Sequence, residues 1–181
     1  MPDFARPRRL AASLVLAVAL AAPDPARAQF GAGGKTLRCP AGEAVRTVQS
    51  RSLKAPAHAD VLRGSRVILV NPLILGRYPP LLQLFLYARE CGIQTEAASQ
   101  GARLDQGRNP DRERAADRTG IRLMRDQLHI SLQEAQKIAA SVAADAPALR
   151  LAPFEGDRAK WILDCYRSRD DACTAEPPSA T

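Results

Sequence analysis

The segment 79–93 constrains the fold more than any other part of this chain. It opens with two prolines, which suit the first turn of a helix because a backbone N–H would be unpaired there in any case. A helix that is apolar on two sides is mostly buried, so the segment predicts a central buried helix. Its apolar residues recur at helical spacing on two sides, with Leu81, Leu84, Phe85, Ala88 and Gly92 on one and Leu82, Leu86 and Ile93 on the other.

Arg89 lies on the second of these apolar sides. A guanidinium stays charged in proteins, and a buried charge without a partner is costly. We therefore expect the Arg89 side chain to meet a carboxylate in the interior. The alternative is that its apolar stem follows the surface and its head group reaches water.

The first 28 residues have the pattern of a secretory signal peptide. Arginines precede an apolar run over 10–22, and Ala26-Arg27-Ala28 forms a small-x-small cleavage site. We therefore expect an exported chain, periplasmic or secreted, that begins at Gln29. The apolar stretch 67–86 is interrupted by prolines and polar residues, so no transmembrane segment is expected after the leader.

The charge pattern does not favour a nucleic-acid partner. The chain has a formal net charge of +7, but its basic residues are spread along the sequence without a dense Lys/Arg cluster or interleaved aromatic residues. After removal of the leader, the length suits one domain over 29–173. The polar, proline-containing tail 174–181 is expected to be disordered.

The cysteines Cys39, Cys91, Cys165 and Cys173 form an even set without a C-x-x-C spacing. In an exported chain such a set indicates disulfides, and three pairings are open. Cys39 with Cys91 would tie the N-terminal arm to the central helix, and Cys165 with Cys173 would close a short loop. This pairing is slightly favoured over the other two.

The remaining pattern predicts a mostly helical α+β fold with a short sheet. A flexible Gly/Ala arm is expected over 29–34, and His58 is expected in a loop rich in alanine and proline. Ser131 and Glu134 have the spacing of a capping box at a helix start. The expected strands cover 45–50 and 66–71, and the further helices cover 111–128, 132–145 and 157–167, with a polar loop over 98–110.

Two of the expected helices carry motif fragments of zinc peptidases. Glu90 lies where an H-E-x-x-H helix has its general base, and 113–117 has the E-x-x-A-D spacing of the following helix. Over about 67–165 the chain resembles small exported bacterial zincin-like proteins of the gluzincin type. The resemblance rests on Asn71-Pro72, Pro79-Pro80, Phe85, Tyr87, Glu90, Cys91, Gly92, Glu113, Ala116, Asp117 and Trp161-Ile162-Leu163-Asp164-Cys165.

The chain departs from the motif at both imidazole positions. They hold Arg89, a permanent cation, and Ile93, which has no donor atom, so neither binds a divalent metal. In gluzincins the Glu of E-x-x-A-D binds zinc and the Asp orients the metal ligands, and these are the positions of Glu113 and Asp117. The resemblance implies a minimal zincin-like core of a short sheet, two motif helices and C-terminal helices. It also implies that Glu90 is a vestigial general base, with no catalytic residue, metal or cofactor retained.

If the two motif helices face each other, the loss of zinc leaves several carboxylates crowded together. We then expect Arg89 to form a hydrogen-bonded ion pair with Glu113 or Asp117. We do not expect it to face Glu90, its direct neighbour on the same helix.

This interpretation predicts an exported pseudoenzyme with a binding or structural role. Its expected partner is a protein or an extended peptide that adds to an edge strand. Two alternatives stay open. One is an active zinc metallopeptidase with non-standard ligands, and the other is a disulfide-stapled helical interaction domain without zincin ancestry.

Overall fold

The computed structural model describes residues 29–40, 45–100, 110–151, 156–168 and 173. The predicted signal peptide, 1–28, and the predicted tail, 174–181, lie outside the described residues, as does most of the loop expected over 98–110. Within the described part the fold is α+β and mostly helical, which confirms the predicted fold class.

Two small sheets form the β part of the fold. The strands β1 and β2 make an antiparallel hairpin, and a three-stranded sheet has the order β3-β5-β4. β3 runs parallel to β5, and β4 runs antiparallel to it. The strands are β1 (Gln29–Ala32), β2 (Lys35–Arg38), β3 (Arg46–Gln49), β4 (Ala57–Leu62) and β5 (Ser65–Val70).

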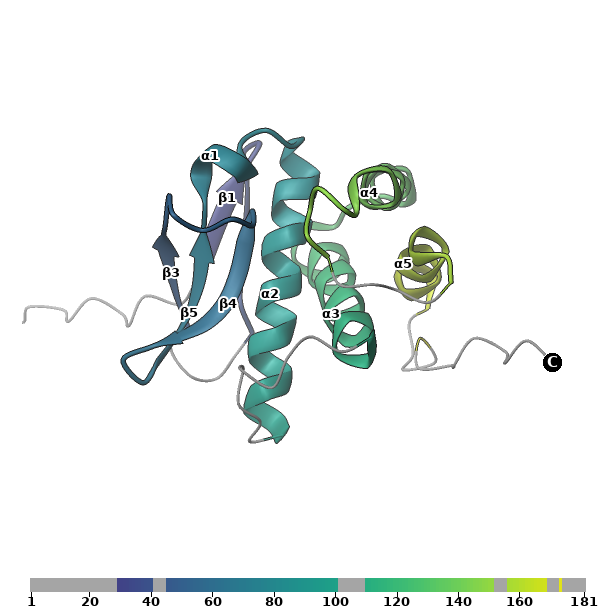
Figure 1. Ribbon diagram of the computed structural model, residues 1–181. Helices are drawn as coiled ribbons and strands as arrows, with labels where there is room; N and C mark the ends of the chain where they lie inside the picture. Colours follow the sequence, from purple (N-terminus) through teal and green to yellow (C-terminus); the bar gives the residue numbers. More distant parts are fainter. Residues whose placement is uncertain (1–28, 41–44, 101–109, 152–155, 169–172, 174–181) are drawn as a thin grey trace, which may run out of the picture.

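The helix α2 lies at the centre of the molecule, between the sheet and the helices α3, α4 and α5 (Figure 1). It begins at the second proline of the Pro79-Pro80 pair, as predicted. Its side chains from Leu84 to Gln94 are all buried, which confirms a buried central helix. The helices are α1 (Pro72–Leu75), α2 (Pro80–Gln100), α3 (Pro110–Leu128), α4 (Leu132–Asp145) and α5 (Arg158–Arg167).

Two glycines let α2 and α3 approach each other closely. A Cβ atom on Gly92 of α2 would lie 2.8 Å from the Cβ atom of Thr119, and one on Gly120 of α3 would lie 3.1 Å from the backbone N of Arg89. Protein atoms do not pack at the first of these distances, so a side chain at Gly92 would push the helices apart. The close approach brings the polar side chains of the two helices together.

Several sequence predictions are confirmed in detail. Ser131 and Glu134 form the predicted capping box at the start of α4, and the helix expected over 157–167 is α5, which begins one residue later with Asp157 as its N-cap. Disulfides join Cys39 to Cys91 and Cys165 to Cys173, the slightly favoured pairing. Among the described helices, none combines the length and apolar character needed to cross a bilayer.

Three predictions about local structure are wrong. The expected arm over 29–34 is the strand β1 followed by a turn, because Gly33 and Gly34 adopt the positive φ angles, +57° and +76°, that a tight hairpin requires. His58 lies in the strand β4 and not in a loop. The helix α2 continues to Gln100, into the start of the loop expected over 98–110.

Candidate functional site

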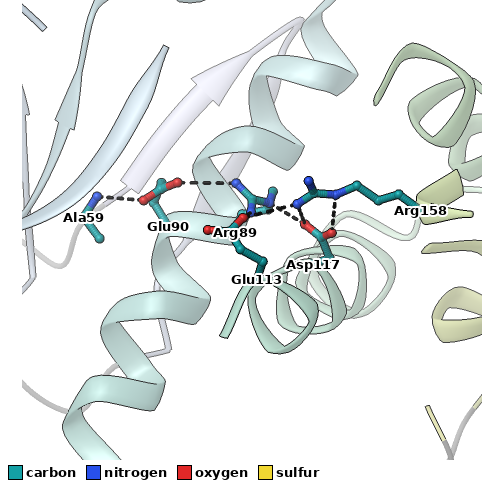
Figure 2. A network of polar contacts seen from close by, with 6 residues as sticks. All are labelled: Ala59, Arg89, Glu90, Glu113, Asp117 and Arg158. Atoms are coloured by element: carbon teal, nitrogen blue, oxygen red, sulfur yellow. Dashed lines mark hydrogen bonds and ion pairs between the residues drawn. The ribbon is translucent and has the colours of Figure 1, made fainter. Parts of the chain in front are cut away.

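A buried ion network lies where α2 meets α3 (Figure 2). Arg89 and Glu90 come from α2, and Glu113 and Asp117 come from α3. The two α3 carboxylates are four residues apart, so they share one face of the helix, which is turned toward α2. The structure thus brings together the Glu and Asp of the E-x-x-A-D segment with the helix that carries Glu90.

Arg89 bonds to both carboxylates of α3. Its Nε donates to Oδ1 of Asp117, and its Nη2 donates to Oε2 of Glu113. The predicted ion pair is therefore present, and it involves both candidate carboxylates instead of one.

The expectation that Arg89 does not face Glu90 is wrong. Arg89 Nη1 lies 3.5 Å from Glu90 Oε1. Adjacent residues point about 100° apart on a helix, but both side chains are long enough to turn toward the same interior space. At this distance the contact is an ion pair without a hydrogen bond.

Arg158 is a member of the network that the sequence reasoning missed. It lies in the first turn of α5, and its side chain extends to Asp117 of α3. Its Nε donates to Asp117 Oδ2 at 2.7 Å, and its Nη2 donates to Asp117 Oδ1 at 3.1 Å. A weaker contact of 3.3 Å joins Nη2 to Glu113 Oε2. A signal was present in the sequence, because Arg158, Ile162 and Cys165 lie at i, i+4 and i+7 and so share the buried face of α5.

The five charged side chains of the network are excluded from water. Arg89 is 1% exposed, Glu113 and Asp117 are 0% exposed, and Arg158 is 7% exposed. Burial alone would lower the pKa of Arg89, but the negative charges of Asp117, Glu113 and Glu90 outweigh it, so the pKa of Arg89 is raised above its ordinary value. The cluster holds two guanidinium groups against three carboxyl groups, which keeps the buried charge nearly balanced.

Glu90 connects the network to the sheet. Its Oε2 accepts a hydrogen bond of 2.7 Å from the backbone N–H of Ala59 in β4 (Figure 2). One turn further along α2, Gln94 Nε2 donates to the carbonyl oxygens of Asp60 and Val67, at 3.0 and 2.8 Å. Glu90 is 2% exposed, so its carboxylate fixes β4 against α2 and does not open into solvent.

The bond from Ala59 to Glu90 lies on the outer edge of β4. Asn71 N–H donates to Pro56 O just before the strand, and backbone groups alternate in direction along an antiparallel ladder. The N–H groups of Ala59 and Val61 therefore face away from β5. Both are bonded to carboxylates of the chain, Ala59 to Glu90 and Val61 to Asp60 Oδ1 at 2.7 Å.

Ile93, which takes the second imidazole position in the comparison with H-E-x-x-H, makes an apolar contact. Its side chain is 6% exposed and clusters with Ala59 and Ala116. Among the described residues, no group of three His, Cys, Asp or Glu side chains is arranged to hold a metal ion. The donor set also argues against one, because Glu113 and Asp117 are engaged by two guanidinium groups that repel a cation.

No protein-family model, curated protein or solved structure matches this chain. The comparison with gluzincins thus depends on the motif residues and on the geometry of α2 and α3.

Proposed function

We propose that this protein is an exported zincin-like pseudoenzyme, with a binding or structural role in place of peptidase activity. The observation that carries the proposal is the Arg89 guanidinium bonded to both Glu113 and Asp117, the positions that the gluzincin motif assigns to the metal site. A guanidinium provides fixed positive charge and directed donors to the same carboxylates that a divalent ion would neutralise.

The environment of Glu90 also supports the absence of peptidase chemistry. A general base must reach the water whose proton it removes. Glu90 is buried, accepts the Ala59 N–H and lies beside Arg89, so its lone pairs are committed to structural contacts. In these surroundings Glu90 is placed to connect the sheet to α2 and not to transfer a proton.

A protein or extended peptide remains our proposed partner. The edge of β4 is poorly suited to strand addition, because the N–H groups of Ala59 and Val61 are already bonded. The opposite edge of the sheet, formed by β3, is the better candidate for such a contact. The signal-peptide pattern and the two disulfides support export.

Zinc binding tests the proposal directly. The purified protein, with its disulfides intact, should retain less than one zinc per chain after dialysis against zinc and removal of excess metal. Elemental analysis gives the ratio. One tightly held zinc that is lost in Glu113→Ala would contradict the proposal and favour the metallopeptidase with non-standard ligands.

Restoring the ligands provides a positive control. Arg89→His with Ile93→His recreates the two imidazoles of the motif, but Arg158 would still hold Glu113 and Asp117. We therefore expect zinc binding in the triple variant that also carries Arg158→Ala, and weaker or no binding in the double variant. Ile93→His alone, which keeps Arg89, is the matched control and should not bind zinc.

A further inference from the structure

A separate pocket lies about two helical turns from the ion network, at the start of α2. It has a volume of about 520 Å³ and opens between the β1–β2 hairpin, the first turn of α2 and one side of α4. Pockets of this size accept one small organic molecule. The α4 residues that line it, Glu134, Lys137, Ile138 and Ser141, are spaced as one helical face.

The walls of the pocket are mainly apolar. Ala32 contributes from the hairpin, Pro79 to Leu82 from the helix start and Ile138 from α4. The hairpin is closely packed here, since a Cβ atom on Gly33 would lie 2.8 Å from the Cβ atom of Pro80. The shape of the pocket is therefore set by backbone and ring contacts, which favours a preformed site over one that must open.

Three charged side chains line the pocket, and two of them form an ion pair with each other. Lys35 Nζ lies 3.1 Å from Glu134 Oε1, and Glu134 Oε2 also accepts the backbone N–H of Ser131 at 2.7 Å. The Ser131 backbone bond and Lys35 lower the pKa of Glu134, so this carboxylate is ionised and neutralises Lys35. Among the described residues, Lys137 has no hydrogen-bond or ion-pair partner. The pocket therefore combines apolar walls with one uncompensated cation.

We propose that this pocket binds one small amphiphilic anion, a molecule with an apolar body and a single carboxylate. The apolar body would lie against Leu81, Leu82 and Ile138, and the carboxylate would pair with Lys137. A neutral ligand would leave Lys137 without a partner, and a second negative charge on the ligand would gain no further pairing, because Lys35 is already neutralised by Glu134. This site does not depend on the proposed function, because none of its lining residues belongs to the ion network.

Titration calorimetry with decanoate below its micelle concentration, compared with decanol, tests the charge requirement. Decanoate should bind the purified protein with a 1:1 stoichiometry and more tightly than decanol. Lys137→Ala should weaken decanoate binding about two- to fivefold, as expected for a solvent-accessible ion pair, and leave decanol binding unchanged. Lys54→Ala, at an exposed lysine outside the pocket lining, is the matched control and should bind decanoate like the unaltered protein.

A second variant tests the location. Ser141→Trp should fill part of the pocket and weaken binding at least tenfold, whereas Ala140→Trp, on the exposed side of the same helix, should have no effect. Equal binding to the Lys137 and Lys54 variants, equal binding to both tryptophan variants, or a preference for decanol would overturn the proposal. Zinc analysis of the same preparations reports on the pseudoenzyme proposal separately, since neither pocket variant touches Glu113.

Discussion

Arg89 is the side chain on which most contacts of the ion network depend. It bonds to Asp117 and Glu113 and lies beside Glu90, so each of these buried carboxylates has it as a partner. A buried pair contributes little compared with apolar packing, but removing one member leaves an uncompensated charge. The network therefore matters more for what its loss would do than for the energy that it adds.

We predict that Arg89→Ala lowers the free energy of unfolding by about 3 to 5 kcal/mol, because it removes a buried guanidinium that is bonded to both Glu113 and Asp117. Urea unfolding at neutral pH measures the loss. Arg167→Ala, at an exposed arginine, is the control and should change stability by less than about 0.5 kcal/mol. A loss below 1 kcal/mol in Arg89→Ala would contradict the structural role of the network.

The ionisation of Tyr87 makes the free energy of unfolding depend on pH, and a Tyr87→Phe variant separates this contribution from the others. Its hydroxyl lies 2.8 Å from Thr47 Oγ1, and burial, partly opposed by this hydrogen bond, raises the pKa of Tyr87 from 10.0 to about 12. The folded state holds this proton more tightly than the unfolded state. The stabilisation is therefore complete below pH 10 and is lost as the pH rises from 10 toward 12.

We predict that the unaltered protein loses stability relative to Tyr87→Phe between pH 10 and 12, because the variant has no phenol to ionise. Chemical unfolding of both proteins across this range measures the difference. A constant difference in free energy of unfolding would show that Tyr87 ionises equally easily in the folded and unfolded states.

At the scale of the elements, the contact between α2 and α3 positions the site. Alanine at a helical glycine normally gains up to about 1 kcal/mol from helix propensity. At Gly92 the added Cβ atom would meet Thr119 at 2.8 Å and the Ala116 backbone at 3.2 Å, so crowding outweighs this gain. At Gly120 the nearest atoms are 3.1 Å away or more, and the crowding is milder.

We predict that Gly92→Ala destabilises the protein by about 1 to 2 kcal/mol and that Gly120→Ala costs clearly less. Thermal and urea unfolding of the two variants provide a matched comparison, since both place the same side chain in the same interface. The reverse order, or a stabilising Gly92→Ala, would mean that the helices separate more easily than their packing indicates.

The elements differed in how well the sequence predicted them. α2, α4 and α5 have long apolar patterns and start signals, Pro79-Pro80, Ser131 and Asp157, so their positions follow from local chemistry. β1 was missed because glycines that suggest a flexible arm also form a hairpin turn. β4 was missed because its alanines carry little strand propensity, and its place is set by pairing with β5.

The candidate site was predicted only in part. The pairing of Arg89 with Glu113 and Asp117 followed from the cost of buried charge, which depends on residue type alone. Arg158 arrives from a helix distant in sequence, and Ala59 contributes a backbone group. The spacing of Arg158 with Ile162 and Cys165 indicates that it is buried but does not name its partners, and Ala59 has no signal, so the packing of α5 and β4 against α2 and α3 is needed to place both.

At the scale of the whole molecule, the two disulfides constrain loops of very different length. Cys39 and Cys91 are 52 residues apart, whereas Cys165 and Cys173 are 8 residues apart. The first joins the end of the β1–β2 hairpin to the central helix, and the second acts within the C-terminal segment. In the chain-entropy model, a longer closed loop restricts the unfolded state more.

We predict that replacing Cys39 and Cys91 by alanine costs about 4 kcal/mol, and that replacing Cys165 and Cys173 costs about 2.5 kcal/mol. Urea midpoints of the two double variants, measured without reductant, give the order. Equal losses would show that the bridges act mainly through native contacts and not through the unfolded chain.

The bonded edge of β4 also affects how copies of this protein meet. A free strand edge is a template on which another copy can add a strand, and this is a common first step in aggregation. In β4, Glu90 and Asp60 already accept the N–H groups of Ala59 and Val61, so an incoming strand would have to displace bonds within the chain. Glu90, a side chain of the central helix, therefore protects this edge of the sheet against the addition of a strand from another copy.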